Sequence, residues 1–227
     1  KKNLSFISKS LKQEQKKYNI SLCGGDTTFS NKLSFTILSL GFSKNIVYRN
    51  KAKLGDDIYV TGNLGDSYLG LQILKNKINF EKKINNYFIN KYYQPDIQIS
   101  LANKILNLAN TSIDISDGLI ADLEKMLNKQ PYSYQIDMEK IPTSKYLSVI
   151  LKKNKFKKSK LISNGDDYQV LFTANTNKSR IINKISKIYG IKITKIGKII
   201  SGNKRSNIID QKSKKILLKN KGYIHKF

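Results

Sequence analysis

Apolar residues recur along the chain with two periods, one typical of helices and one typical of strands. The helical period is clearest where Leu119, Ile120, Leu123, Met126 and Leu127 follow one another at i, i+1, i+4, i+7 and i+8. It predicts further helices over residues 4–18, 67–75, 86–93, 96–110, 144–151 and 178–189. Alternating or short apolar runs predict strands over residues 20–23, 33–42, 57–62, 134–138, 191–200, 207–209 and 215–218, and one more within 161–173.

The order of these elements indicates the fold class. Helices and strands are mixed without strict alternation, and there is no internal repeat at a solenoid period. We therefore expect an α+β fold in which helices pack on one face of a mostly antiparallel or mixed sheet. The polar and basic residues 43–54 form the candidate domain boundary.

The stretch from residue 111 to 123 is central to the prediction. It begins as a short β-rich run and continues as the helix described above, so Asp114 should end a strand and Ser116 or Asp117 should cap a helix. Gly118 allows a close turn there. Such a junction offers free backbone N–H groups to a phosphate, and two carboxylates beside it suit a divalent cation. The alternative, in which Asp117 only caps the helix and Asp114 is a surface residue, stays open.

The charge balance at first suggests a nucleic-acid partner, because the formal net charge is +26. Only three of the 42 basic residues are arginine, however, and arginine is the residue preferred for bidentate phosphate and base contacts. The lysines are spread along the chain, and a run such as residues 152–160 is typical of a solvated surface. We expect non-specific polyanion binding at low salt and no specific nucleic-acid partner.

Acidic residues are scarce and therefore more informative. Twelve of the 16 are Asp, and several lie beside Gly in turns: Asp26 in Gly-Gly-Asp-Thr-Thr, Asp114 and Asp117 in Asp-Ile-Ser-Asp-Gly, and Asp166 and Asp167 in Asn-Gly-Asp-Asp-Tyr. In a strongly basic chain, this placement indicates the chemistry of a binding site.

The sequence gives weaker indications of the protein's cellular location and of whether the chain is a fragment. The chain has no apolar run long enough to span a membrane, and its one cysteine, Cys23, suits a reducing compartment, so we expect a cytoplasmic protein with no membrane partner. It begins with Lys, so we expect a fragment or a processed product. The single histidine, His225, lacks Cys or His neighbours in sequence and is not expected to bind a metal.

Six short motifs follow one another in a characteristic order. They are residues 24–28 (Gly-Gly-Asp-Thr-Thr), 54–62 (Leu-Gly-Asp-Asp-Ile-Tyr-Val-Thr-Gly), 64–67 (Leu-Gly-Asp-Ser), 112–119 (Ser-Ile-Asp-Ile-Ser-Asp-Gly-Leu), 164–168 (Asn-Gly-Asp-Asp-Tyr) and 221–223 (Lys-Gly-Tyr). This succession resembles the thiamine-monophosphate kinases, a family of the aminoimidazole-ribonucleotide-synthetase-like superfamily. The resemblance covers essentially the whole chain.

The resemblance implies two domains and a shortened N-terminus. Residues 1–43 would be the end of an N-terminal α/β domain that binds ATP and magnesium, and residues 44–227 would be the C-terminal α+β domain. The family pairs its N-terminal domains across a dimer, so the complete protein is expected to be a homodimer.

The implied activity is transfer of the γ-phosphate of ATP to thiamine monophosphate, giving thiamine diphosphate, with Mg²⁺ as cofactor. By resemblance, the metal ligands are Asp26, Asp114 and Asp117. The nucleotide-binding residues are Gly25, Asp26, Arg49 and Ser116.

The substrate contacts implied by the resemblance are Asp166 and Tyr223. Asp166 stands where the family usually has Glu, so the side chain here is shorter. Tyr223 matches an aromatic residue that packs on the thiamine moiety. Two alternatives stay open: another ATP-dependent synthetase of the same superfamily, and an inactive basic binding fragment that keeps the fold.

Overall fold

The computed structural model describes residues 2–153 and 156–223, so His225 lies outside the described residues. The chain divides into two compact units, one ending at Phe42 and the other beginning at Ser43, and each is described here by itself. Among the described residues, no helix is long and apolar enough to cross a membrane.

The first unit contains the helix α1 (Lys2–Tyr18), as expected, followed by irregular chain to residue 42. The strands expected over residues 20–23 and 33–42 are therefore wrong. A strand needs a neighbouring strand to pair its backbone N–H and C=O groups, and none of the described strands lies in this unit. Its apolar side chains are correspondingly exposed; Phe29 and Phe42 are about fully accessible, at 98% and 103%.

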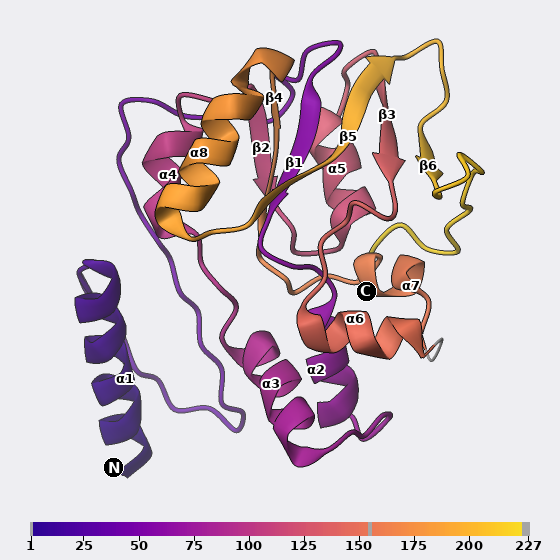
Figure 1. Ribbon diagram of the computed structural model, residues 1–227. Coiled ribbons are helices and arrows are strands. Elements are labelled where there is room, and N and C mark those ends of the chain that lie inside the picture. The colour runs from indigo at the N-terminus through magenta and orange to yellow at the C-terminus, as the bar shows by residue number, and fades with distance from the viewer. Residues whose placement is uncertain (1, 154–155, 224–227) are drawn as a thin grey trace. The chain divides into compact units, whose positions relative to one another are not determined.

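The second unit is built on a six-stranded sheet with the order β2-β4-β1-β5-β3-β6 (Figure 1). Its strands are β1 (Asp57–Thr61), β2 (Thr111–Asp114), β3 (Tyr132–Asp137), β4 (Val170–Ala174), β5 (Ile193–Ser201) and β6 (Asn207–Ile209). Neighbouring strands are antiparallel except β3 and β6, which are parallel. The mixed sheet of an α+β fold is confirmed.

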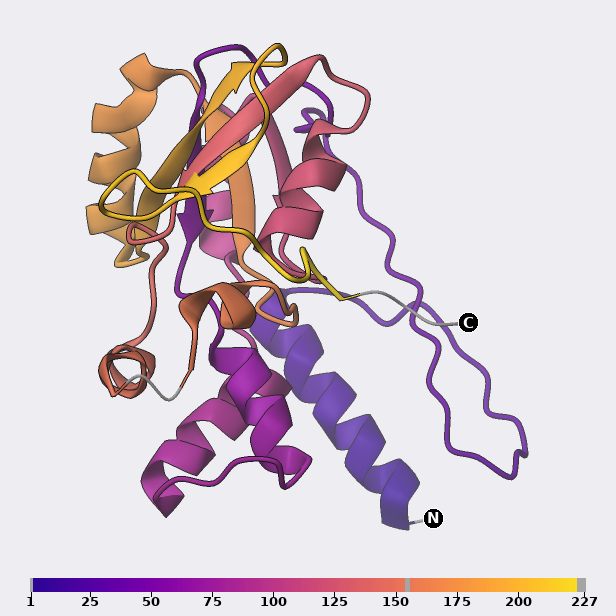
Figure 2. The same cartoon turned by 90° about the vertical axis from the view of Figure 1, so that its right-hand side faces the viewer.

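Helices cover both faces of the sheet, not one face as expected (Figures 1 and 2). Side chains alternate between the faces of a strand, and the central strand β1 is apolar at successive positions. Ile58 and Val60 pack in the core beneath α5 (Leu119–Leu127). Tyr59 points the other way and packs with α4 (Ile99–Ile105) and α8 (Ser179–Tyr189).

The other helices form a separate apolar cluster. They are α2 (Asp66–Leu74), α3 (Lys82–Tyr93), α6 (Lys145–Lys152) and α7 (Lys158–Ile162). Within it, a Cβ on Gly70 would lie 2.2 Å from the Phe88 carbonyl oxygen, so only glycine allows α2 to approach α3 this closely.

Three predictions differ from the structure in detail. The helix expected over residues 96–110 is the shorter α4, because Asn110 leaves the helical path and its side-chain amide donates to Asp56. The five-residue helix α7 was not predicted; it is too short to show a period. The expected C-terminal hairpin is reduced to β6 and one bridge between Ile209 and Lys215.

Candidate functional site

The junction of β2 and α5 has the predicted strand–turn–helix form. Asp114 is the last residue of β2, and the helix begins at Leu119 after Gly118, which has φ of 130°. The five apolar positions from Leu119 to Leu127 are all buried beneath the sheet. Asp114 is exposed and Ser116 and Asp117 are partly exposed, so the turn presents its polar side chains at the surface.

Asp122 caps this helix, and neither Ser116 nor Asp117 does so. Its carboxylate oxygen Oδ2 accepts the backbone N–H groups of Ser116, Asp117 and Gly118 at 2.9, 2.8 and 3.1 Å. The prediction of free N–H groups at the junction is therefore wrong for these three amides. The physical reason is that Asp122, in the first helical turn, folds back over the turn and is 1% exposed.

Lys125 joins the capping residue to a predicted metal ligand. Its Nζ lies 2.9 Å from Asp122 Oδ1 and also forms an ion pair with Asp117. The hydrogen bond that Lys125 donates to Asp117, ahead of the one that it donates to Asp122, raises the pKa of Lys125. The turn is thus held by both carboxylate oxygens of Asp122 and by one lysine.

The loop that carries Asp166 is bonded directly to the same turn. Asp166 N donates to Ser116 O at 3.0 Å, and Tyr168 N donates to Ile115 O at 2.9 Å. Gly165 makes this approach possible, because a Cβ there would lie 1.6 Å from Ser116 O. Burial raises the pKa of Asp166, and the nearby negative charge of Asp117 adds to it.

The C-terminal motif is attached to the other side of the turn. Tyr223 N donates to Asp117 O at 2.8 Å, and Ala121 N donates to Lys221 O at 3.1 Å. A Cβ on Gly222 would meet the Ala121 Cβ at 2.4 Å. The backbone of Tyr223 is therefore fixed beside Asp117 while its side chain stays 59% exposed, in reach of a ligand.

The segment that carries Arg49 is bonded to β2 and to α5, the two elements that meet at the junction. Asn50 N donates to Met126 O in α5 at 2.9 Å, and Thr111 Oγ1 donates to Tyr48 O at 2.8 Å. These two bonds hold Arg49 between β2 and α5.

Two cavities open at this junction, with volumes of about 600 and 500 Å³. Arg49 and Lys125 line both of them. The larger also contains Glu124, Lys221 and Tyr223, and the smaller also contains Asp114, Ser116 and Asp122. A separate cavity of about 760 Å³, lined by residues of the segment 138–159 with Lys192, contains none of the predicted site residues.

The predicted residues Gly25 and Asp26 lie in the first unit, where both are exposed. The N–H of Thr27 donates to Asp26 Oδ1 at 2.7 Å, so this carboxylate shapes its own turn. The second unit brings together the other six predicted residues: Arg49, Asp114, Ser116, Asp117, Asp166 and Tyr223. Their roles stay predictions.

The donors at the junction suit magnesium in chemical type. Across residues 2–153 and 156–223, no group of three or more His, Cys, Asp or Glu side chains is placed to hold a metal ion. Magnesium in phosphate-transfer sites uses one or two protein carboxylates, with water and substrate phosphates completing its oxygen ligands. The pair Asp114 and Asp117 matches that need, so the residues fit the ion.

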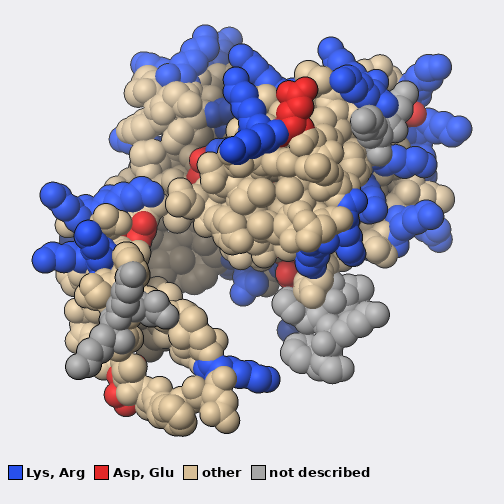
Figure 3. Space-filling model, turned by 90° about the horizontal axis from the view of Figure 1, so that it is seen from below, with Lys and Arg blue, Asp and Glu red and all other residues tan. Residues whose placement is uncertain are grey.

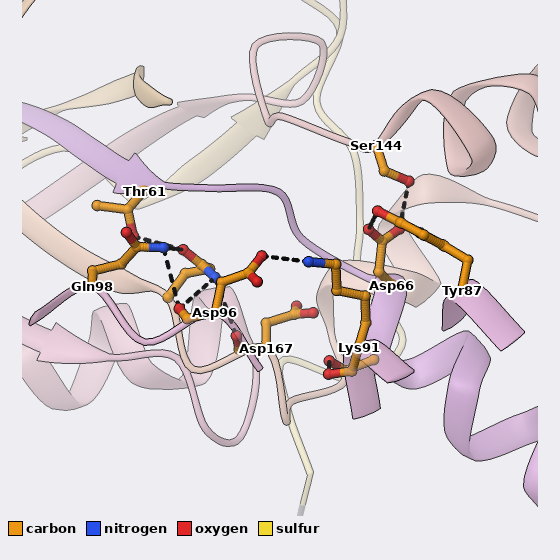
Figure 4. A network of polar contacts seen from close by, with 10 residues as sticks. Thr61, Asp66, Tyr87, Lys91, Asp96, Gln98, Ser144 and Asp167 are labelled. Atoms are coloured by element: carbon orange, nitrogen blue, oxygen red, sulfur yellow. Dashed lines mark hydrogen bonds and ion pairs between the residues drawn. The ribbon is translucent and has the colours of Figure 1, made fainter. Parts of the chain in front are cut away.

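Sequence reasoning missed a buried polar network around Asp66 and Asp167 (Figure 4). Asp66 accepts hydrogen bonds from Ser144 Oγ at 2.8 Å and Tyr87 Oη at 2.9 Å. Asp167 Oδ2 accepts from Gly65 N at 2.9 Å. Burial raises the pKa of Asp66 to about 6 and that of Asp167 well above its ordinary value.

This network anchors the loop of Asp166 to the N-terminus of α2. The signal available in the sequence was the pair of motifs Leu-Gly-Asp-Ser and Asn-Gly-Asp-Asp-Tyr, each with an Asp beside Gly. Nothing local shows that the two motifs meet, because they are about a hundred residues apart.

Basic side chains are dispersed over the surface. On the face seen in Figure 3, blue lysine and arginine side chains lie in many separate places and do not form one patch. The expectation that the chain has no specific nucleic-acid partner stays a prediction.

The chain is similar to curated proteins named thiamine-monophosphate kinase. One from Buchnera aphidicola subsp. Schizaphis graminum is 40% identical over 225 residues, covering 98% of this chain and 69% of the relative. Another, from Buchnera aphidicola subsp. Acyrthosiphon pisum, is 38% identical over 213 residues, covering 92% and 65%. The chain thus spans about two thirds of the length of these relatives. No model of a protein family matches it.

A solved structure agrees with the sequence comparison. The structure described as "AaThiL complexed with AMPPCP and TMP" superimposes with a TM-score of 0.65 at 28% identity. The match covers 80% of this chain and 55% of that one.

Proposed function

The chain belongs to the thiamine-monophosphate kinase family, and from this premise we propose that it serves ATP-dependent phosphorylation of thiamine monophosphate to thiamine diphosphate. The observation that carries the proposal is the turn at residues 115–117. The Asp166 loop and the 221–223 segment both donate backbone hydrogen bonds to it, so the segments that carry Asp166 and Tyr223 are attached to the turn that carries Ser116 and Asp117. A relative named for this activity has been solved with an ATP analogue and TMP.

The proposed roles follow from charge. Both substrates are anionic, and two carboxylates about 5 Å apart already repel by roughly 3 kcal/mol at an effective dielectric of 20. We assign Asp114 and Asp117 to hold magnesium, which when bound would supply positive charge to the phosphates, and Arg49 and Ser116 to contact the nucleotide. For Asp26 and Gly25 in the first unit, the metal and nucleotide roles are those that the family resemblance implies.

The acceptor phosphate is itself a nucleophile, so no side chain has to attack the γ-phosphate. The main task of the protein is therefore to position the two substrates. We assign Asp166 to contact the substrate. Its carboxyl is partly buried, and this burial raises its pKa. The exposed ring of Tyr223 offers a flat surface on which an aromatic or cationic ring of thiamine can stack.

We propose the same organisation that the family resemblance implies. The unit ending at Phe42 is the end of the N-terminal domain, and the unit beginning at Ser43 is the C-terminal domain. The complete protein is a homodimer, which the exposed apolar residues of the first unit support, because such surface is typical of interfaces. The single cysteine supports a cytoplasmic location.

The test is a product assay with ATP, Mg²⁺ and thiamine monophosphate, read by chromatography for thiamine diphosphate. Asp117→Asn should lower turnover by on the order of 100-fold or more, as does loss of other charge-stabilising groups. Asp137→Asn, which changes a carboxylate paired with Lys140 outside the site, is the matched control. Product from another acceptor, and none from thiamine monophosphate, would favour a different synthetase of the superfamily.

A further inference from the structure

The capped turn raises the question of what binds a phosphate there. A helix N-terminus usually binds anions through its unpaired N–H groups. Here the N–H groups of Ser116, Asp117 and Gly118 already donate to Asp122. These three N–H groups are therefore not available to an anion, and the cationic side chains at the junction are the other charged donors that could bind one.

Lys125 is placed for that task. Of the residues that the structure describes, Arg49 and Lys125 are the two that line both cavities at the junction. The third cation there, Lys221, lines only one cavity and is paired with Glu124 at 2.8 Å. The Lys125 side chain is 44% exposed, so solvent and ligands can reach it.

The two partners of Lys125 differ in how far solvent and ligands can reach them. Asp122 is 1% exposed, and four hydrogen bonds fix its two oxygens. The side chain of Asp117 is 23% exposed. A lysine ammonium has three donors on a flexible stem, so it can keep Asp122 as an anchor and exchange Asp117 for another oxygen.

We propose that Lys125 is a further ligand-binding residue of the site, whose ammonium holds Asp117 until a divalent cation takes that carboxylate and then binds a phosphate oxygen of the nucleotide. Asp122 is the positioning residue that keeps Lys125 within reach. This inference rests on the proposed function, because it assumes that Asp117 binds the metal.

The exchange solves a charge problem. Without a cation nearby, Asp117 and Asp122 would present two negative charges to an anionic nucleotide. The ammonium of Lys125 partly neutralises these two carboxylates. A metal ion must displace the ammonium from Asp117, so Lys125 opposes metal binding alone but favours nucleotide binding once the metal is present.

The test is to measure two affinities of the 227-residue chain by calorimetry, first for Mn²⁺ alone and then for AMPPCP with saturating Mg²⁺. Lys125→Met should bind Mn²⁺ about two- to fivefold more tightly, because an exposed ion pair no longer competes for Asp117. It should bind AMPPCP about 10- to 100-fold more weakly, because a charge-assisted hydrogen bond is lost. Changes of opposite sign are not expected from a merely structural residue.

Two further variants make the test specific. Lys184→Met removes the same charge from an exposed position in α8 and should leave both affinities unchanged. Lys125→Arg keeps a cation and should recover most of the AMPPCP affinity. Circular dichroism confirms that each variant is folded.

The inference is overturned if folded Lys125→Met binds either ligand as the parent chain does. Saturable Mn²⁺ binding that is equal in both proteins would remove the inference and leave the proposed metal site intact. If neither protein binds Mn²⁺, the metal role of Asp117 fails and the inference fails with it.

Discussion

Gly165 offers the most direct structural test of how the site is held together. It lies where the Asp166 loop crosses the turn after β2, and an added Cβ would lie 1.6 Å from Ser116 O and 2.3 Å from Ser116 C. Both atoms belong to the backbone and cannot rotate away. Gly165→Ala must therefore push the two loops apart.

The size of the effect follows from the contacts that separation breaks. Ordinary contact begins at 3.4 Å, so the backbones must move far enough to lose the hydrogen bonds from Asp166 N and Tyr168 N, now 3.0 and 2.9 Å long. Two hydrogen bonds contribute about 1 kcal/mol each, and overpacking costs about 1–3 kcal/mol. We expect a loss of about 4 kcal/mol, equivalent to roughly 10 °C in Tm for a domain of this size.

The assay is thermal unfolding followed by circular dichroism, with Gly41→Ala as the matched control. Gly41 has no atom within 4 Å of an added Cβ, so that variant should unfold like the parent chain. The product assay on folded Gly165→Ala should also show weakened turnover. A Tm within about 2 °C of the parent would refute the reasoning, because the loops would then not be packed backbone against backbone.

Two further predictions concern buried carboxylates. The pKa of Asp66 rises from 3.8 to about 6 on folding, so the folded state binds the proton more tightly than the unfolded state. Unfolding free energy should therefore fall as pH rises from about 4 to 6, by up to about 3 kcal/mol, and stay lower above that range. Asp66→Asn should flatten this part of a urea-unfolding profile measured against pH; an unchanged slope would show that Asp66 is not the group responsible. Asp122→Ala leaves three backbone N–H groups without their acceptor and should cost about 2–5 kcal/mol. Asp122→Asn, which keeps one acceptor oxygen, should cost less in the same urea titration, and equal losses would argue against the capping role.

The parts of the fold that sequence pattern predicted are those set by local spacing. The helix from Leu119 to Leu127 and the end of β2 at Asp114 are both found, because periodic burial and a glycine turn define them within a few residues. Expected strands in the first unit are absent, since a strand depends on partner segments that a local pattern does not reveal.

The site shows the same limit. The helical period assigns Asp122 no role beyond its place in a helix, although its position in the first turn allows it to accept hydrogen bonds from the N–H groups of the preceding residues. Its capping role removes the free amides that the motif at residues 112–119 had suggested. Likewise, Asp66 and Asp167 meet only through tertiary packing, which two separate motifs do not disclose.

The family resemblance predicted site residues that the spacing of apolar and acidic residues alone did not indicate. It grouped Arg49, Asp166 and Tyr223 with the β2–α5 junction, and the structure gives a physical reason for that grouping. Asp166 and Tyr223 lie on segments joined to the junction by backbone hydrogen bonds. Arg49 lines both cavities beside it.

We propose that these segments form one ligand-binding site, which ¹H–¹⁵N NMR spectra of the chain can test while Mg²⁺–AMPPCP and then thiamine monophosphate are added. The amide signals of Ser116, Asp117, Asp166 and Tyr223 should shift together, saturably. Shifts confined to the separate cavity around residues 138–159, or no saturable shift at the four amides, would contradict this proposal.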